Sequence, residues 1–165
     1  MPSEAVRDLV LRPGTESDAP ALARLQRRAR ATAPMPEGIH PPADVERFLA
    51  ARLAHREGRD EVWVAQTPDG PTPTGYARFT PTWLDDLYVD PAHQGQGIGS
   101  ALLGLVCSRL PGGFALWVFE TNTPARRFYA RHGLREVEAT DGRDNEEQEP
   151  DVRMEWRREW RPAPP

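Results

Sequence analysis

A glycine-rich turn that joins a short apolar segment to a longer one limits the possible folds of this chain more than any other feature. Residues 87–89 lead to this turn, and residues 100–110 after it are mostly apolar. The first turn of a helix has backbone N–H groups without intrahelical acceptors, at the positive end of the helix dipole. Glycine leaves these groups open to an anion and permits positive φ, although it also occurs in ordinary turns. The pattern predicts a phosphate-binding turn made by Gln94, Gly95, Gln96, Gly97, Ile98, Gly99 and Ser100.

The composition argues against several classes of partner and reaction. The chain has 165 residues and a net charge of −4. We expect a single domain over residues 1–165, and neither a nucleic-acid nor a membrane partner, because such binding needs clustered positive charge or long apolar segments. The basic side chains other than histidine are all arginine, which excludes a Schiff-base lysine. Cys107 has no disulfide partner within the chain, so we expect it in the core of a cytoplasmic protein.

Hydrophobic periodicity and turn residues predict alternating strands and helices. The segment after the glycine turn reads as a helix between two strands, which we expect to be parallel neighbours in a βαβ unit. Prolines at 34, 36, 41 and 42 mark a loop that is either a lid or a plain connection. The predicted strands are residues 6–12, 61–66, 75–80, 83–89, 114–119, 134–139 and 152–158, and the predicted helices are residues 19–31, 43–56, 100–110 and 124–132.

The region from residue 83 to 133 resembles the core of the GNAT superfamily of acetyl-CoA-dependent N-acetyltransferases. The segment from Gln94 to Gly99 is similar to the Gln/Arg-x-x-Gly-x-Gly/Ala pyrophosphate loop of that family. The strand before the loop and the helix after the next strand also fit. The residues that carry this second part are Leu87, Tyr88, Val89, Asp90, Pro91, Asn122, Ala125, Phe128, Tyr129 and Gly133.

The resemblance implies an α/β (α+β) fold in three layers. Its central mixed, mostly antiparallel sheet of about six to seven strands is splayed at its centre and flanked by about four helices. Acetyl-CoA would enter between residues 83–89 and 114–119. Leu87, Tyr88 and Val89 would lie beside the pantetheine arm, residues 94–100 would bind the pyrophosphate, and Asn122 and Tyr129 would close the other side. The acceptor side would be formed by the proline loop, the second helix, Trp83, Trp117 and the last hairpin.

The implied reaction is direct attack of a primary amine on the thioester in a ternary complex. Tyr129 would be the general acid for the departing thiolate, although its position alone also suits a half-buried aromatic residue. A backbone N–H near Val89 would stabilise the oxyanion. Asp85 is the first candidate for the general base and Glu120 the second. Because neighbouring side chains on a strand point to opposite faces, we expect only one of Asp85 and Asp86 to reach the notch.

Other polar residues carry weaker predictions. His40, His55, His93 and His132 have no metal-ligand spacing, so we expect no metal. The acidic segment 146–151 either attracts a cationic acceptor or is a solvated hairpin. The acceptor stays open among small amines, amino acids, antibiotics and protein N-termini, and the protein is expected to be a monomer or homodimer.

Two other functions compete with this interpretation. A dinucleotide-binding oxidoreductase would use Gly95, Gly97 and, at the end of a following strand, Glu120 on the ribose. Ser100 replaces the third glycine of that motif, and too little chain follows for a second βαβαβ half. A non-catalytic acyl-CoA-binding or sensor domain would share the fold, since a fold does not establish activity.

Overall fold

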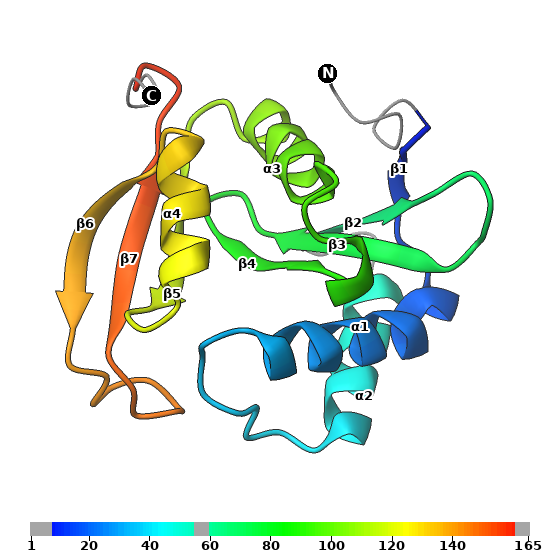
Figure 1. The fold of residues 1–165 in the computed structure, drawn as a ribbon, viewed down its shortest axis with the longest axis horizontal. Coiled ribbons are helices and arrows are strands. Elements are labelled where there is room, and N and C mark those ends of the chain that lie inside the picture. The colour runs from blue at the N-terminus through cyan, green and yellow to red at the C-terminus, as the bar shows by residue number, and fades with distance from the viewer. Residues whose placement is uncertain (1–7, 55–59, 161–165) are drawn as a thin grey trace.

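The computed structural model describes residues 8–54 and 60–160 (Figure 1). Two short 3₁₀ helices, Glu16–Asp18 and Pro91–His93, accompany the longer elements. In chain order these are β1 (Val10–Pro13), α1 (Ala19–Thr32), α2 (Pro42–Ala54), β2 (Glu61–Gln66), β3 (Pro73–Phe79), β4 (Leu84–Val89), α3 (Ile98–Arg109), β5 (Phe114–Phe119), α4 (Thr123–Arg131), β6 (Arg135–Thr140) and β7 (Asp151–Trp156).

The predicted strands and helices are confirmed within the described residues, with ends that shift by a few positions. Residues 6 and 7 of the first predicted strand and residues 55 and 56 of the second predicted helix lie outside the described residues. The 3₁₀ helix Pro91–His93 was not predicted. It begins where the Asp90 carboxylate accepts a hydrogen bond of 2.9 Å from the Ala92 N–H, which caps this short turn.

The strands form two antiparallel sheets that meet at a single point. One sheet has the order β1-β2-β3-β4 and the other β5-β7-β6. Between them there is one parallel bridge in the described part of the chain, from Trp83 to Ala115, where the Ala115 N–H donates to the Thr82 carbonyl at 2.9 Å. The predicted splay of the sheet at its centre is therefore confirmed. The predicted parallel pairing of β4 with β5 extends over this one bridge and no further among the described residues. Antiparallel pairing of β1 to β4 also contradicts the dinucleotide-binding alternative, which requires a parallel sheet.

Helices cover both faces of the larger sheet (Figure 1). The helix α3 lies on one face and α1 and α2 lie on the other. Alternation along β3 explains the two cores, because Tyr76 packs with α1 and α2 whereas Ala77 packs with α3. Close approach of α3 requires Gly75, where a Cβ atom would lie 3.0 Å from Ile98 Cγ2. Cys107 packs against the α3 core, and burial raises the pKa of its thiol to about 11.

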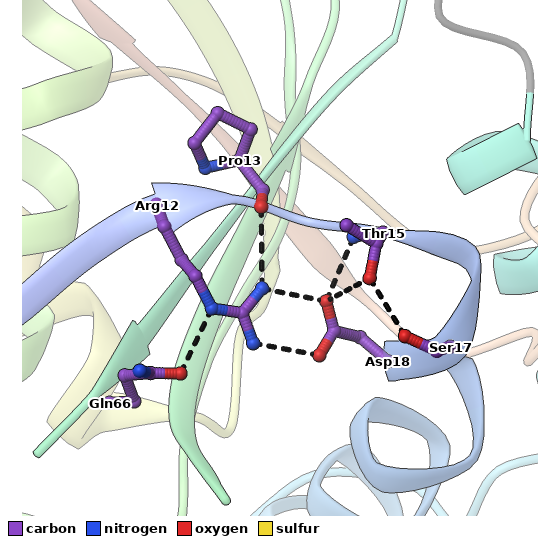
Figure 2. A network of polar contacts seen from close by, with 6 residues as sticks. All are labelled: Arg12, Pro13, Thr15, Ser17, Asp18 and Gln66. Atoms are coloured by element: carbon purple, nitrogen blue, oxygen red, sulfur yellow. Dashed lines mark hydrogen bonds and ion pairs between the residues drawn. The ribbon is translucent and has the colours of Figure 1, made fainter. Parts of the chain in front are cut away.

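A charged network ties the edge of the larger sheet to the start of α1 (Figure 2). The Arg12 guanidinium on β1 donates two hydrogen bonds of 2.8 Å to the two carboxylate oxygens of Asp18. The Thr15 N–H donates to the same carboxylate at 2.8 Å, and Arg12 Nε donates to Gln66 of β2 at 2.9 Å. The hydrogen bond from Arg12 holds the pKa of Asp18 below its usual value. The first strand is thus fixed to the first helix.

We expect the Asp18→Asn variant to lose about 1–3 kcal/mol of unfolding free energy at neutral pH, because it weakens charge-assisted hydrogen bonds. Asp18 has a lower pKa when folded than when unfolded. Its contribution is therefore fully present above an unfolded pKa of about 4 and is lost as pH falls through the folded value. Urea unfolding of wild type and variant should show a difference that shrinks below about pH 4. Glu16→Gln, an exposed change in the same turn, is the control, and a difference that grows on acidification contradicts the assignment.

Candidate functional site

A cavity of about 270 Å³ opens where β4 and β5 separate. It is lined by both diverging strands, by the side of α1 that faces the sheet, and by the start of α4. The strand residues are Leu84 to Tyr88 and Leu116 to Phe119, and the remaining lining residues are Gln26, Arg30, Met35, Asn122, Ala125 and Tyr129. The cavity thus connects the α4 side of the splayed sheets with the α1 side.

The open edge of β4 presents backbone groups to this gap. The Asp90 N–H donates to the Thr74 carbonyl at 2.8 Å and so points toward β3. Amides of alternate residues in a strand point to the same side, so the N–H groups of Leu87 and Val89 point toward β5. In the described part of the chain, the only bridge between β4 and β5 segments lies earlier, at Trp83. Leu87 and Val89 therefore offer amides to an extended ligand in the gap.

The glycine turn opens α3 as the sequence predicts. Gly97 precedes the helix with φ 83°, and Gly95 has φ 76° in open space, where an added Cβ atom would meet no heavy atom within 4 Å. Because α3 begins at Ile98, the amides of Ile98, Gly99 and Ser100 lie in its first turn, which has no intrahelical acceptors for them. These donors and the open space at Gly95 fit an anionic phosphate group.

The side chains of Gln94 and Ser100 in this turn already have hydrogen-bond partners. Gln94 Nε2 donates to the Val89 carbonyl at 3.2 Å. His132 Nδ1 donates to the Phe128 carbonyl at 2.8 Å, and the Ser100 hydroxyl lies 3.0 Å from His132 Nε2. These bonds tie the turn to β4 and α4, and leave its backbone amides as the donors for a ligand.

The prediction that only one of Asp85 and Asp86 reaches the notch is wrong. Both residues line the cavity, and Arg78 lies 2.7 Å from Asp86 and 3.8 Å from Asp85. The cause is a β-bulge. Arg78 pairs with Asp86 but the next residue of β3, Phe79, pairs with Leu84, so Asp85 is an extra residue that interrupts the alternation.

The two carboxylates differ in their surroundings. Asp86 accepts a hydrogen bond from Arg78 Nε, and Arg78 Nη1 donates to Asp60 at 3.1 Å. Asp85 makes no hydrogen bond among the described residues, and its side chain is 33% exposed. Burial raises its pKa, the charges of Asp86 and Asp60 raise it further, and Arg78 opposes them. Asp85 is therefore a stronger base than an ordinary aspartate.

Two tyrosines contribute to the wall of the cavity. Tyr129 comes from α4 and Tyr88 from β4, and both line it. Burial raises the pKa of Tyr129, and the neighbouring Tyr88 and Asp86 raise it further. Burial also raises the pKa of Tyr88, whose hydroxyl accepts a hydrogen bond from Arg30 at 3.4 Å. Both phenols stay protonated at neutral pH and serve as donors rather than bases.

The remaining predicted residues separate into two groups. Asn122 lines the cavity and caps α4, since its side-chain oxygen accepts from the Ala125 N–H at 3.3 Å. Glu120 is exposed and does not line the cavity, and its carbonyl accepts from Arg126. Sequence reasoning missed Gln26 and Arg30, which lie on α1 about sixty residues before β4 and carry no local motif.

The proline loop after α1 is held against the acidic segment. Arg30 donates to the Pro36 carbonyl at 3.1 Å and lies 3.9 Å from the Glu147 carboxylate. His40 and Glu146 are 2.9 Å apart, and the Thr121 hydroxyl donates to the Pro34 carbonyl at 3.1 Å. In Figure 1 this loop reaches the loop between β6 and β7. The acidic segment thus contacts Arg30 and His40 of the chain itself.

Metal-binding clusters and membrane-spanning helices are both absent from the described ranges. Within residues 8–54 and 60–160, no three or more His, Cys, Asp or Glu side chains are arranged to hold a metal ion. Of the helices in these ranges, none combines the length and apolar character needed to cross a bilayer.

Known proteins share both the sequence pattern and this arrangement. The family model for the acetyltransferase (GNAT) family matches residues 22–134. The peptidyl-lysine N-acetyltransferase YjaB of Salmonella typhimurium is 38% identical over 74 residues, which make up 45% of this chain and 50% of that protein. The chain therefore spans about half the length of this curated relative.

Solved structures share the fold at lower identity. The solution structure of apo YjaB from Escherichia coli has a TM-score of 0.72 and 20% identity, and the match covers 90% of this chain and 97% of that one. The PaiA N-acetyltransferase of Thermoplasma acidophilum, in complex with coenzyme A, has a TM-score of 0.72 and 19% identity, with 90% and 98% covered.

We expect the three tyrosines to ionise at a higher pH in the folded protein than in denaturant, because burial raises the pKa of Tyr76, Tyr88 and Tyr129. The rise in absorbance at 295 nm should therefore begin at a higher pH for the folded protein than for the unfolded chain. In denaturant all three should titrate together near their ordinary value of about 10. One tyrosinate that forms near pH 10 while circular dichroism still reports native structure contradicts the buried tyrosine pair.

Proposed function

The chain belongs to the acetyltransferase (GNAT) family, and we propose that it transfers an acetyl group from acetyl-CoA to a primary amine by direct attack in a ternary complex. The observation that carries this proposal is the cavity between β4 and β5. It is lined from the α1 side and the α4 side of the sheets, so two substrates can approach one point from opposite directions. The amides of Leu87 and Val89 on β4 lead to the glycine turn at the start of α3. Asp85 lines the cavity itself.

The residues of one approach suit acetyl-CoA. The amides of Ile98, Gly99 and Ser100 and the open space beside Gly95 would bind the pyrophosphate. The Val89 amide would pair with the pantetheine arm in the manner of an added strand. Asn122 and Tyr129 of α4 would close the other side of the arm. The fit supports acetyl-CoA as the acyl donor, as in the wider family.

The groups in the cavity supply the three functions that acetyl transfer needs. Asp85 takes the proton of the incoming ammonium, which frees the nitrogen lone pair to form a bond with the thioester carbon. The N–H of Leu87, a β4 residue that lines the cavity, donates to the oxygen that becomes negative in the tetrahedral intermediate. As the carbon–sulfur bond breaks, the Tyr129 hydroxyl donates its proton to the thiolate, and the second proton that the nitrogen loses on becoming an amide restores the phenol. The one proton released overall leaves through Asp85. The raised pKa of Tyr129 keeps its phenol protonated at neutral pH before the transfer.

The non-catalytic sensor alternative predicts the same binding without this chemistry. A sensor would need the glycine turn to bind acyl-CoA, but it would need neither Tyr129 nor Asp85 in the cavity. The name of the relative YjaB supports an acetyltransferase whose acceptor is a lysine side chain. We therefore extend the proposal to acceptors with a primary aliphatic amine. A screen of thiol release from acetyl-CoA across small amines, amino acids, antibiotics and peptides tests it, and cofactor binding with no thiol release from any acceptor favours the sensor.

The Tyr129→Phe variant should lower kcat at least ~100-fold while the dissociation constant of acetyl-CoA changes less than about twofold, because only the proton donor is lost. Thiol release and calorimetric titration measure the two quantities. Tyr76→Phe is the control, since Tyr76 is a fully buried tyrosine that does not line the cavity. Equal turnover in Tyr129→Phe and wild type removes this residue from the mechanism.

The Asp85→Asn variant should lower kcat/KM by about 100-fold or more at neutral pH, as expected for loss of a general base. Wild-type activity should rise with pH as Asp85 ionises, with a midpoint above the ordinary aspartate value of about 4, because burial raises its pKa. The variant should lose this acid limb. Glu120→Gln is the comparison, since Glu120 is exposed outside the cavity, and an equal loss there would assign the base to Glu120 instead.

A further inference from the structure

Two tryptophans stack at the point where the two sheets meet. Trp83 precedes β4 and forms the bridge to Ala115, and Trp117 lies two residues further along β5. Their ring centroids are 6.3 Å apart and their planes are inclined by 15°. Trp117 is nevertheless 45% exposed and lines the cavity. A large aromatic ring that is held rigidly from one side therefore presents surface to the cavity.

Trp117 faces the side opposite α4. Its neighbours Leu116 and Val118 belong to the core into which Phe128 and Tyr129 of α4 pack, so alternation along β5 sends Trp117 to the other face. Asp85 and Trp117 each lie two residues after the bridge between Trp83 and Ala115, on the two strands that separate from that point. Both residues line the cavity, so an aromatic ring and a carboxylate are present at the same end of the gap.

Among the described residues, the charged groups around this point include one carboxylate more than guanidinium groups. Asp60, Asp85 and Asp86 surround two guanidinium groups, those of Arg52 and Arg78. Asp60 and Asp86 are 12% and 11% exposed and lie closest to these groups, whereas Asp85 is 33% exposed. The surplus negative charge therefore lies on the carboxylate that faces the cavity.

The two arginines of this cluster lie over a different aromatic ring, that of Phe48. Arg52 and Arg78 lie 4.8 Å and 5.0 Å from the centroid of Phe48 on α2. Among the described arginines, none is stacked on Trp117. The ring of Trp117 and an incompletely paired carboxylate in the same cavity form an arrangement that attracts a cation from solution, because an aromatic face and a carboxylate both favour positive charge.

We propose that Trp117 is a specificity residue that binds the alkylammonium group of the acceptor beside Asp85. This inference rests on the proposed function and adds the residue that recognises the acceptor, as an aliphatic amine that is cationic when it binds. The indole ring of Trp117 covers the methylene groups and the ammonium group of the acceptor before Asp85 removes a proton from that ammonium. Trp83 holds the ring in place and so reduces the entropy lost on binding.

Steady-state kinetics test this assignment with Nα-acetyl-lysine amide as acceptor. Trp117→Leu should raise the acceptor KM about tenfold, with kcat and the acetyl-CoA KM changed less than twofold, because it removes a cation–π contact and keeps an apolar side chain. Trp117→Phe should retain most of the affinity. Val137→Ala is the control, since Val137 is a similarly exposed apolar residue on β6. An unchanged acceptor KM in Trp117→Leu, or an equal rise in the acetyl-CoA KM, overturns the proposal.

Direct binding separates this inference from catalysis. The chain has five tryptophans, and comparison with Trp117→Phe identifies the indole N–H signal of Trp117 in a nitrogen–proton NMR spectrum. Nα-acetyl-lysine amide should shift this signal, and Nα-acetyl-norleucine amide, which lacks the ammonium, should shift it only at concentrations at least about tenfold higher. Equal shifts from both, or no shift from either, overturn the proposal. Selective shifts together with no thiol release from any amine would support the binding site and contradict the proposed transfer reaction.

Discussion

The separation of β4 from β5 after one bridge creates the opening around which the whole site is organised. Among the described residues the two strands do not pair beyond Trp83 and Ala115, so the amides of Leu87 and Val89 lack strand partners. Unpaired backbone groups are costly when buried, and they are tolerated here because the gap is a cavity that a ligand or water can enter. Two continuous antiparallel sheets on either side hold this opening in a fixed shape.

The polar groups inside the opening are organised by contacts from distant segments. Arg78 on β3 bridges Asp60, Asp85 and Asp86, while Arg30 on α1 contacts Tyr88 and the proline loop. These arginines neutralise part of the negative charge that the bulge at Asp85 brings to the cavity. Asp85, which has no hydrogen bond in the described contacts, keeps a raised pKa as a result of burial and of its acidic neighbours. The proposed base and acid thus owe their protonation states to packing.

Local sequence patterns were sufficient for the elements and for the glycine turn. Apolar periodicity and turn residues located the strands and helices to within a few positions, because each depends mainly on neighbours along the chain. The same reasoning failed at Asp85 and Asp86. A bulge is a property of two strands in register, and neither strand alone shows that Phe79 pairs with Leu84 rather than with Asp85. The contribution of α1 to the cavity was missed for a similar reason, since it depends on how a helix packs on the sheet.

The amino-acid order alone specifies that a glycine turn opens α3 after β4 and that α4 follows β5 with Asn122 and Tyr129 on it, because these features are local. The tertiary structure then decides which carboxylates face the gap and which side chains of the glycine turn have hydrogen-bond partners within the protein. It also stacks Trp117 on Trp83 at the cavity that Asp85 lines. Local patterns fix backbone conformation over a few residues. Strand register, helix packing and burial arise only when segments distant in the chain come together, and they set the charge and shape of the site.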